Sequence, residues 1–335
     1  MAYEHQSAPD KGQHGSSHSE LQRKRFVIPS TRLIRPCAAI EPETKTWDGV
    51  PSIVDRLSAL TEELPLAGAD ALKALPNGEL AITARLRAAA PWFGSAIDHL
   101  DQQWRLQLWA GRPWIAFRPL LLVGPPGTGK SHLARLIAEA SGCGHSVLSL
   151  AGVADASTVE GSPRAFTNTM PCFPALIMSQ HRTGNPIAVI DEIEKASPDP
   201  RHGDPVAALL AFLEPSTAAA YWDRCLLAHV DLSHVSWLLT ANSLDGLPAP
   251  LRSRLDIFEV RGPGPEHFPV LLTNLMRELA ADWNVPPHLL PHLEEEAEVL
   301  LEQRFAKHRS VRRLGRELRA ALAAGVAAAP AQTRS

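Results

Sequence analysis

The sequence lacks several features that would place the protein in other classes. Its cysteines lie far apart and form no CxxC pair, which argues against a disulfide framework or a zinc cluster; they are Cys37, Cys143, Cys172 and Cys225. No stretch approaches the roughly 20 apolar residues that span a bilayer, and the amino terminus lacks the apolar core of a signal peptide. We therefore expect a cytoplasmic protein without a membrane segment.

The chain also lacks a strong net charge. It has 33 Lys and Arg against 36 Asp and Glu, a formal charge of -3, so no global positive field attracts nucleic acid or an anionic membrane. Hydrophobic residues make up 45% and charged residues 21%, which is typical of folded globular proteins. The length of 335 residues accommodates one large or two ordinary domains.

The pattern of residues changes twice along the chain. Residues 1–30 are predicted to be a disordered tail, because their start is rich in Ser, Gly, Gln and His and has no hydrophobic period. Residues 31–112 are predicted to be a helical segment, with helices over 52–64, 78–90 and 95–109. An α/β domain is expected over 113–262, a small helical domain over 263–329, and a short tail over 330–335.

Short apolar runs alternate with helical segments after Arg118, which is typical of a parallel sheet with crossover helices. One of these helices has clear boundaries, with Asp204 as N-cap, Pro205 at its first position and Pro215 as its stop. The fold class is thus α/β, a three-layer arrangement of helices around a parallel sheet of five strands. The predicted strands are Leu120–Val123, Ser146–Leu150, Ile187–Ile190, Val235–Leu239 and Ile257–Val260.

A glycine-rich loop follows the first of these strands and precedes an amphipathic helix. It matches the phosphate-loop pattern G-x-x-x-x-G-K-[ST] in the structural context that this pattern requires. Gly127 and Gly129 let backbone N–H groups face phosphate oxygens, Lys130 supplies a positive charge, and Ser131 supplies an oxygen for Mg²⁺. The predicted binding residues are Gly124, Pro125, Pro126, Gly127, Thr128, Gly129, Lys130, Ser131 and His132.

Polar residues follow two later strands at the same predicted sheet edge. Asp191 and Glu192 come directly after Ile187–Ile190, where open α/β sheets bind ligands. We expect Asp191 to hold Mg²⁺ through water and Glu192 to polarise the water that attacks the γ-phosphate. Asn242 ends the next strand and is expected to help hold that water; a simple turn-forming role is the alternative.

Two arginines, Arg252 and Arg254, precede the last strand. Either one is compatible with a role in surface solvation. An arginine that completes a neighbour's phosphate site contributes on the order of 10³ to 10⁵ in rate, because it neutralises charge on the transferring group.

These strings together resemble the AAA+ ATPases, and more narrowly the ATPase part of the Lon protease family. The narrow resemblance rests on VGPPGTGKSHLA from Val123, IDEIEK from Ile190, GDPVAALLAFLEP from Gly203 and the segments around Asp231 and Ser310. It implies that Arg254 is the arginine finger and that Arg312 is the sensor-2 arginine of the lid. It also implies that Phe166 is an aromatic pore-loop residue, although Thr167 follows where the family has an aliphatic residue.

The resemblance implies a ring, a hexamer by family, that couples Mg²⁺-dependent ATP hydrolysis to remodelling or moving a macromolecule, with protein favoured as the client. Because the sequence ends soon after the lid, we expect no peptidase domain. A nucleic-acid loader or motor stays open as an alternative, because the stretch from Lys307 to Arg319 is basic. A nucleotide-dependent binding switch is a further alternative, and a P-loop metabolite kinase fits less well.

Overall fold

The computed structural model describes residues 25–27, 63–152, 155–163, 169–196 and 203–328. Most of the predicted helix over 52–64 lies outside these residues. Its last residues are not helical, because Glu63–Pro65 forms strand β2. This strand pairs antiparallel with β1 (Arg25–Val27), which lies within the stretch whose composition predicts disorder. Backbone hydrogen bonds to β2 can thus hold β1 in a strand, although the surrounding segment has few hydrophobic residues to bury.

The central sheet has the five parallel strands that the sequence predicts, one with the predicted boundaries and the others with boundaries shifted by up to two residues. Their order is β4-β5-β8-β3-β9. The inner strands β5, β8 and β3 are almost completely buried because both faces are covered, as is usual for parallel sheets, whereas the edge strands β4 and β9 are partly exposed. They are β3 (Leu120–Val123), β4 (His145–Ser149), β5 (Ile187–Asp191), β8 (Ser236–Ala241) and β9 (Asp256–Glu259).

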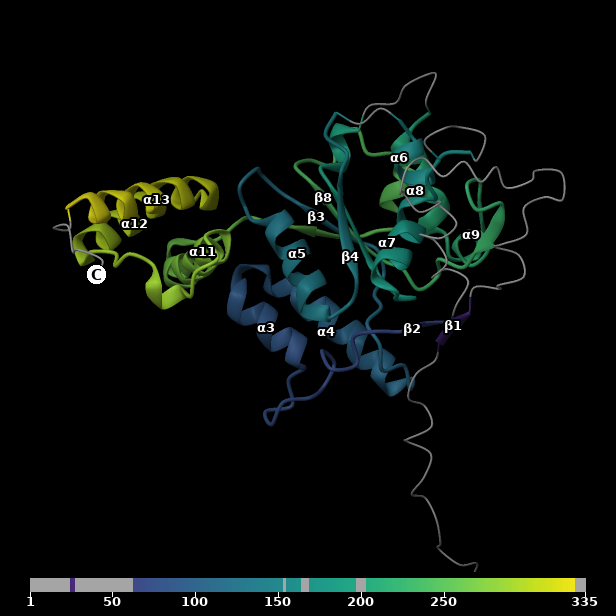
Figure 1. The fold of residues 1–335 in the computed structure, drawn as a ribbon, viewed down its shortest axis with the longest axis horizontal. Helices are drawn as coiled ribbons and strands as arrows, with labels where there is room; N and C mark the ends of the chain where they lie inside the picture. Colours follow the sequence, from purple (N-terminus) through teal and green to yellow (C-terminus); the bar gives the residue numbers. More distant parts are fainter. Residues whose placement is uncertain (1–24, 28–62, 153–154, 164–168, 197–202, 329–335) are drawn as a thin grey trace, which may run out of the picture.

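Alternate residues of each strand pack into different layers. On β3, Leu120 and Leu122 face one hydrophobic cluster while Leu121 and Val123 face the other. The first cluster is covered by α3 (Ala81–Ala89), the 3₁₀ turn η2 (Pro91–Phe93), α4 (Gly94–Trp109) and α5 (Lys130–Ser141). The predicted helices before Pro113 are therefore one layer of the sheet domain (Figure 1).

The second face is covered by five shorter helices. The N-cap predicted at Asp204 is present, since its carboxylate accepts the N–H of Val206 at 2.8 Å. Pro215 follows the end of that helix and also begins the next one. The helices are α6 (Ser157–Glu160), α7 (Phe173–His181), α8 (Pro205–Leu213), α9 (Pro215–Ala218) and α10 (Ala249–Arg252).

A small hairpin, β6 (Tyr221–Asp223) and β7 (Ala228–Val230), has no counterpart among the predicted strands. Its strands are too short to show a clear period. The buried Asp223 carboxylate accepts N–H groups from Cys225 and Leu226, and also from Cys172 at the start of α7. This charge is stabilised by backbone donors and ties the hairpin to the sheet domain.

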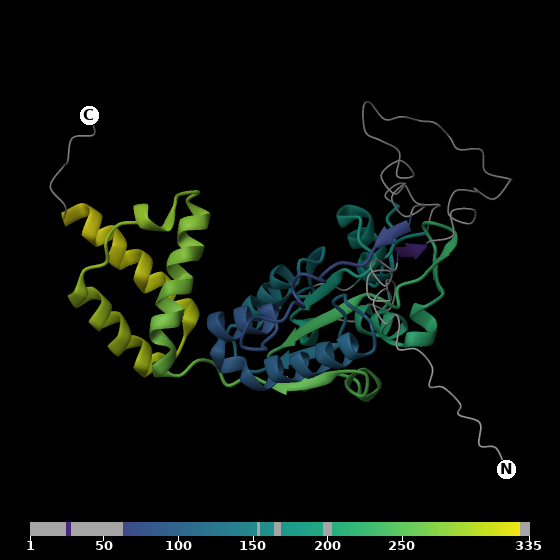
Figure 2. The same cartoon turned by 90° about the horizontal axis from the view of Figure 1, so that it is seen from below.

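Three helices after β9 form a separate group on one side of the sheet domain (Figure 2). They are α11 (Phe268–Asp282), α12 (Glu295–His308) and α13 (Val311–Ala328), with 3₁₀ turns η4 (Pro265–His267) and η5 (Pro287–Leu289). Leu314, Leu318 and Leu322 repeat every four residues on α13 and are buried in the core of this group. We call α11–α13 the lid. Among the described residues, no helix is both long and apolar enough to cross a membrane.

Candidate functional site

The glycine-rich loop lies between the end of β3 and the start of α5. Gly127 and Gly129 have φ values of 85° and 93°, a region that favours glycine. Gly124 packs so closely on the backbone of Val260 that a Cβ atom there would overlap its carbonyl oxygen. The loop can therefore wrap around a phosphate group with its N–H groups and the start of α5 directed at it.

Lys130 is buried at the base of this loop. Its ammonium group donates hydrogen bonds to the carbonyl oxygens of Gly124 at 2.6 Å and Pro125 at 2.9 Å, and to Asn242 Oδ1 at 3.1 Å. Burial lowers the pKa of Lys130, while the nearby carboxylates of Glu194 and Asp191 oppose this shift. The charge is thus held at the phosphate loop by oxygen acceptors.

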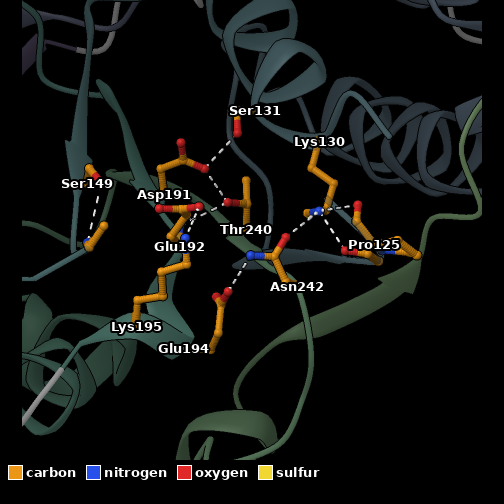
Figure 3. Close-up of polar contacts among 12 residues, drawn as sticks. Pro125, Lys130, Ser131, Ser149, Asp191, Glu192, Glu194, Lys195, Thr240 and Asn242 are labelled. Atoms are coloured by element: carbon orange, nitrogen blue, oxygen red, sulfur yellow. Dashed lines mark hydrogen bonds and ion pairs between the residues drawn. The ribbon is translucent and has the colours of Figure 1, made fainter. Parts of the chain in front are cut away.

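Asp191 ends β5 and faces the loop, as Figure 3 shows. Its Oδ1 accepts a hydrogen bond from Ser131 Oγ at 2.7 Å and another from the hydroxyl of Thr240 on β8. The sheet order, with β5 and β8 adjacent, brings these groups together. Ser131 and Asp191 provide neighbouring oxygens, the donor type that Mg²⁺ prefers.

Glu192 begins the turn after β5 in a left-handed backbone conformation, with φ of 56°. Its N–H donates to Thr240 Oγ1 at 3.1 Å, and its carboxylate pairs with Lys195 Nζ at 2.5 Å. The pairing raises the pKa of Lys195. Residues held in this backbone region cost about 1–3 kcal/mol and cluster at functional sites.

Asn242 lies between a positive and a negative group (Figure 3). Its Oδ1 accepts from Lys130, and its Nδ2 donates to Glu194 Oε1 at 2.6 Å. Asn242 thus makes two side-chain contacts in addition to following β8. The structure connects it to the lysine of the phosphate loop and to an acidic residue that the sequence analysis did not single out.

The phosphate loop opens into a cleft of about 470 Å³ between the sheet domain and the lid. This volume suits a small-molecule ligand. Arg312 on α13 lines the cleft from the lid side, opposite Lys130 and Ser131. His132 also lines it, and its Nδ1 lies 3.0 Å from Glu278 Oε1 on α11, a contact that lowers the pKa of Glu278.

The remaining loop residues are placed around the lysine. Pro126 lines the cleft, and the Pro125 carbonyl accepts from Lys130. Thr128 is buried below the loop, and its hydroxyl donates to the Pro125 carbonyl at 3.0 Å. Pro125 thus contributes its backbone carbonyl to the loop, and Thr128 contributes its side-chain hydroxyl.

Arg254 does not line this cleft. It follows α10, and its guanidinium contacts Glu214 Oε2 at 3.1 Å and the Pro250 carbonyl at 2.8 Å. The family resemblance implies nucleotide-site roles for both Arg254 and Arg312. The structure places only Arg312 at the cleft of its own chain. Phe166 lies outside the described residues, so the structure gives no information on its predicted pore-loop role.

Several residues of the site were missed by the sequence analysis. Arg316 and Arg319 line the cleft beside Arg312, one helical turn and two turns along α13. Phe93 and Trp92 lie about 3.9 Å from the position of a Cβ atom built on Gly129. Spacing on α13 could have indicated the arginines, whereas Phe93 and Trp92 lie 36 and 37 positions before Gly129 and gave no local signal.

Comparison with known proteins agrees with this geometry. Residues 120–262 match the family model described as "ATPase family associated with various cellular activities (AAA)". These residues are thus similar to an AAA domain. The phosphate loop after β3 and the two acids at the end of β5 lie within the matched residues.

Part of the chain is also similar to Lon proteases. Lon protease 2 of Myxococcus xanthus is 36% identical over 201 residues, which cover 59% of this chain and 24% of that protein. The mitochondrial Lon protease homolog of Caenorhabditis elegans is 33% identical over 192 residues, 57% of this chain and 18% of the relative. The chain thus spans about a quarter or less of the relatives it matches, and the similarity is that of a Lon-like ATPase module.

A solved structure supports the fold. The closed-state cryo-EM reconstruction of Hsp104 with ATPγS and FITC casein matches with a TM-score of 0.57 at 16% identity. The match covers 73% of this chain and 47% of that chain. It agrees with the assignment of an AAA fold that includes a parallel five-stranded sheet.

Proposed function

We propose that the protein hydrolyses ATP in the cleft between the sheet domain and the lid. The observation that carries this proposal is the convergence of a phosphate loop, two acids and a lid arginine on one cleft. Each is supplied by a different element, and together they can bind a triphosphate and activate a water molecule.

In this proposal Lys130 exchanges its contacts with loop carbonyls for contacts with the β and γ phosphates. Glu192 accepts a proton from the attacking water, and Asn242 helps to orient that water. Arg312 contacts the nucleotide from the lid. Because it would bind a triphosphate and a diphosphate differently, loss of the γ-phosphate would change the position of the lid.

A magnesium ion fits the donor set of the site. Ser131 Oγ and Asp191 Oδ1 lie 2.7 Å apart, and the described residues hold no group of three His, Cys, Asp or Glu side chains that could form a cage for a metal ion. Mg²⁺ in ATPases is held by few protein ligands together with phosphates and water. Ser131 and Asp191 would hold it, and the ion would neutralise charge on the phosphates.

The proposal extends to a ring of subunits that remodels a protein client. Its support is the relation to Lon proteases and the position of Arg254 away from the chain's own cleft. An arginine on the surface can complete the phosphate site of an adjacent subunit. A hexamer is the ring size that the family resemblance favours.

The nucleic-acid alternative depends on the basic stretch from Lys307 to Arg319. Of the basic residues between Lys307 and Arg319, Arg312, Arg316 and Arg319 line the cleft. Arg313 pairs with Glu317 at 2.8 Å. Three of the six Lys and Arg residues of the basic stretch thus line the proposed nucleotide site. ATPase rates measured with unfolded protein and with DNA distinguish the clients: we expect stimulation by protein, and salt-sensitive stimulation by DNA alone would favour the alternative.

The hydrolysis proposal is tested with Glu192→Gln, which keeps the size of the side chain and removes its basicity. We expect Mg²⁺-dependent turnover in the wild type, and in the variant a fall of about 10²-fold or more with ATP affinity retained. Glu302→Gln on the exposed surface of α12 is the matched control and should keep wild-type turnover. Full turnover in Glu192→Gln would remove Glu192 from the mechanism.

A further inference from the structure

We propose that Glu194 is a positioning residue that fixes the orientation of the Asn242 side chain, so that its oxygen rather than its amino group faces the phosphate loop. This inference rests on the proposed ATPase function. Glu194 does not line the cleft, whereas Asn242 does, so it acts through Asn242 without touching the nucleotide.

The argument starts from the two neighbours of Asn242. The Glu194 carboxylate lies 2.6 Å from Nδ2, and the Lys130 ammonium lies 3.1 Å from Oδ1. A carboxylate only accepts hydrogen bonds and an ammonium only donates them. Of the two ways in which the carboxamide can be turned, only one satisfies both neighbours. The opposite charges on the two sides therefore determine its orientation.

The hydrogen bonding of the Glu194 carboxylate depends on its contact with Asn242. Its second oxygen, Oε2, is buried and has no hydrogen-bond partner among the described residues. Lys195, the next residue, pairs with Glu192. A buried carboxylate oxygen without a donor is destabilising, and natural proteins accept such a cost mainly at functional sites.

The orientation has a consequence for the attacking water. When Lys130 turns to the phosphates, Asn242 Oδ1 is left as a hydrogen-bond acceptor at the cleft. A water that donates one proton to Glu192 and the other to Asn242 has a lone pair free to attack the γ-phosphate. If the carboxamide were turned around, its amino group would bind that lone pair instead.

A double-mutant cycle tests the inference. We measure kcat, the Kd for a fluorescent ATP analogue and the melting temperature for Glu194→Ala, Asn242→Ala and the double variant. We expect each single change to lower kcat about tenfold or more, with nucleotide Kd within about threefold of wild type. The double variant should be no slower than Asn242→Ala, because the two residues act as one unit. Independent effects that multiply in the double variant would overturn the proposal.

An exchange of donor and acceptor provides a second test that keeps the side chains close to their original size. Asn242→Asp places two carboxylates against each other and should lower kcat. Adding Glu194→Gln restores a donor to the carboxylate and leaves an oxygen facing Lys130. We expect the pair to recover kcat several-fold over Asn242→Asp alone. If Glu194→Ala loses stability, the comparison of Asn242→Asp with the double variant Asn242→Asp and Glu194→Gln decides. Failure of the double variant to recover kcat would overturn the proposal.

These experiments distinguish a failure of the Glu194 proposal from a failure of the proposed ATPase function. If the wild type does not hydrolyse ATP, the proposed function fails together with this inference. If the wild type hydrolyses ATP, Glu192→Gln does not, and Glu194→Ala keeps wild-type kcat, only the role of Glu194 is wrong. Glu302→Ala on the surface of α12 is the control for removal of a carboxylate.

Discussion

At the scale of single residues, the site depends on side chains that are satisfied by one another. Ser131 and Thr240 both donate to Asp191, and Asn242 is held between Lys130 and Glu194. Because these donors and acceptors are already paired with one another, the side chains have few alternative hydrogen-bonding arrangements. This network positions the side chains that one chain contributes to the site.

Gly124 offers a test of how closely the loop is packed. Gly124→Ala adds a methyl group that overlaps the Val260 carbonyl, so we expect a loss of about 1–3 kcal/mol in unfolding free energy and weaker nucleotide binding. Denaturant unfolding and nucleotide titration measure both effects. Gly94→Ala is the control, because nothing lies near its Cβ position and it begins α4. Equal behaviour of the two variants would contradict the packing argument.

The residues of the phosphate loop and the acids of β5 could be predicted from the sequence because each is part of a continuous string. Thr240 and Glu194 could not be singled out in this way. Their importance comes from contacts across 48 or 49 positions of the chain, made when β5 and β8 become neighbours. A local pattern contains no information on such a pairing.

At the scale of elements, strands with long apolar runs and helices with clear caps were predictable. The hairpin β6–β7 was not, because three-residue strands have no measurable period. The layer formed by α3 and α4 was predicted as helix but not as part of the sheet domain. Its placement depends on tertiary contacts such as those of Trp104 in the buried cluster.

The N-cap of α8 can be tested on its own. Asp204→Ala removes the acceptor of the Val206 N–H, so we expect a loss of about 1 kcal/mol in unfolding free energy. Asp70→Ala is the comparison, because its carboxylate is exposed and pairs with an exposed lysine. Chemical denaturation of both variants gives the difference. An Asp204→Ala protein as stable as Asp70→Ala would show that the cap contributes nothing.

At the scale of the whole molecule, the two predicted arginines have different positions relative to the cleft. Arg312 reaches it from the lid of the same chain, whereas Arg254 is held by Glu214 away from it. In the proposed ring, each complete site would combine the phosphate loop of one subunit with Arg254 of the next.

Subunit mixing tests this arrangement. We expect Arg254→Ala to bind nucleotide but lose turnover, and Lys130→Ala to lose binding and turnover. Mixing equal amounts should restore about a quarter of wild-type turnover, because random neighbours then combine an intact loop with an intact arginine at that frequency. Turnover is followed by phosphate release. A mixture no faster than the average of its components would rule out a shared site.

The contacts of Lys130 have a consequence for how nucleotide affinity should be interpreted. Three oxygens already surround its ammonium group, two from the loop backbone and one from Asn242. An incoming phosphate therefore competes with these oxygens and must replace them. The affinity for ATP is accordingly a difference between two sets of contacts of one cation, those with the loop carbonyls and Asn242 and those with the phosphates.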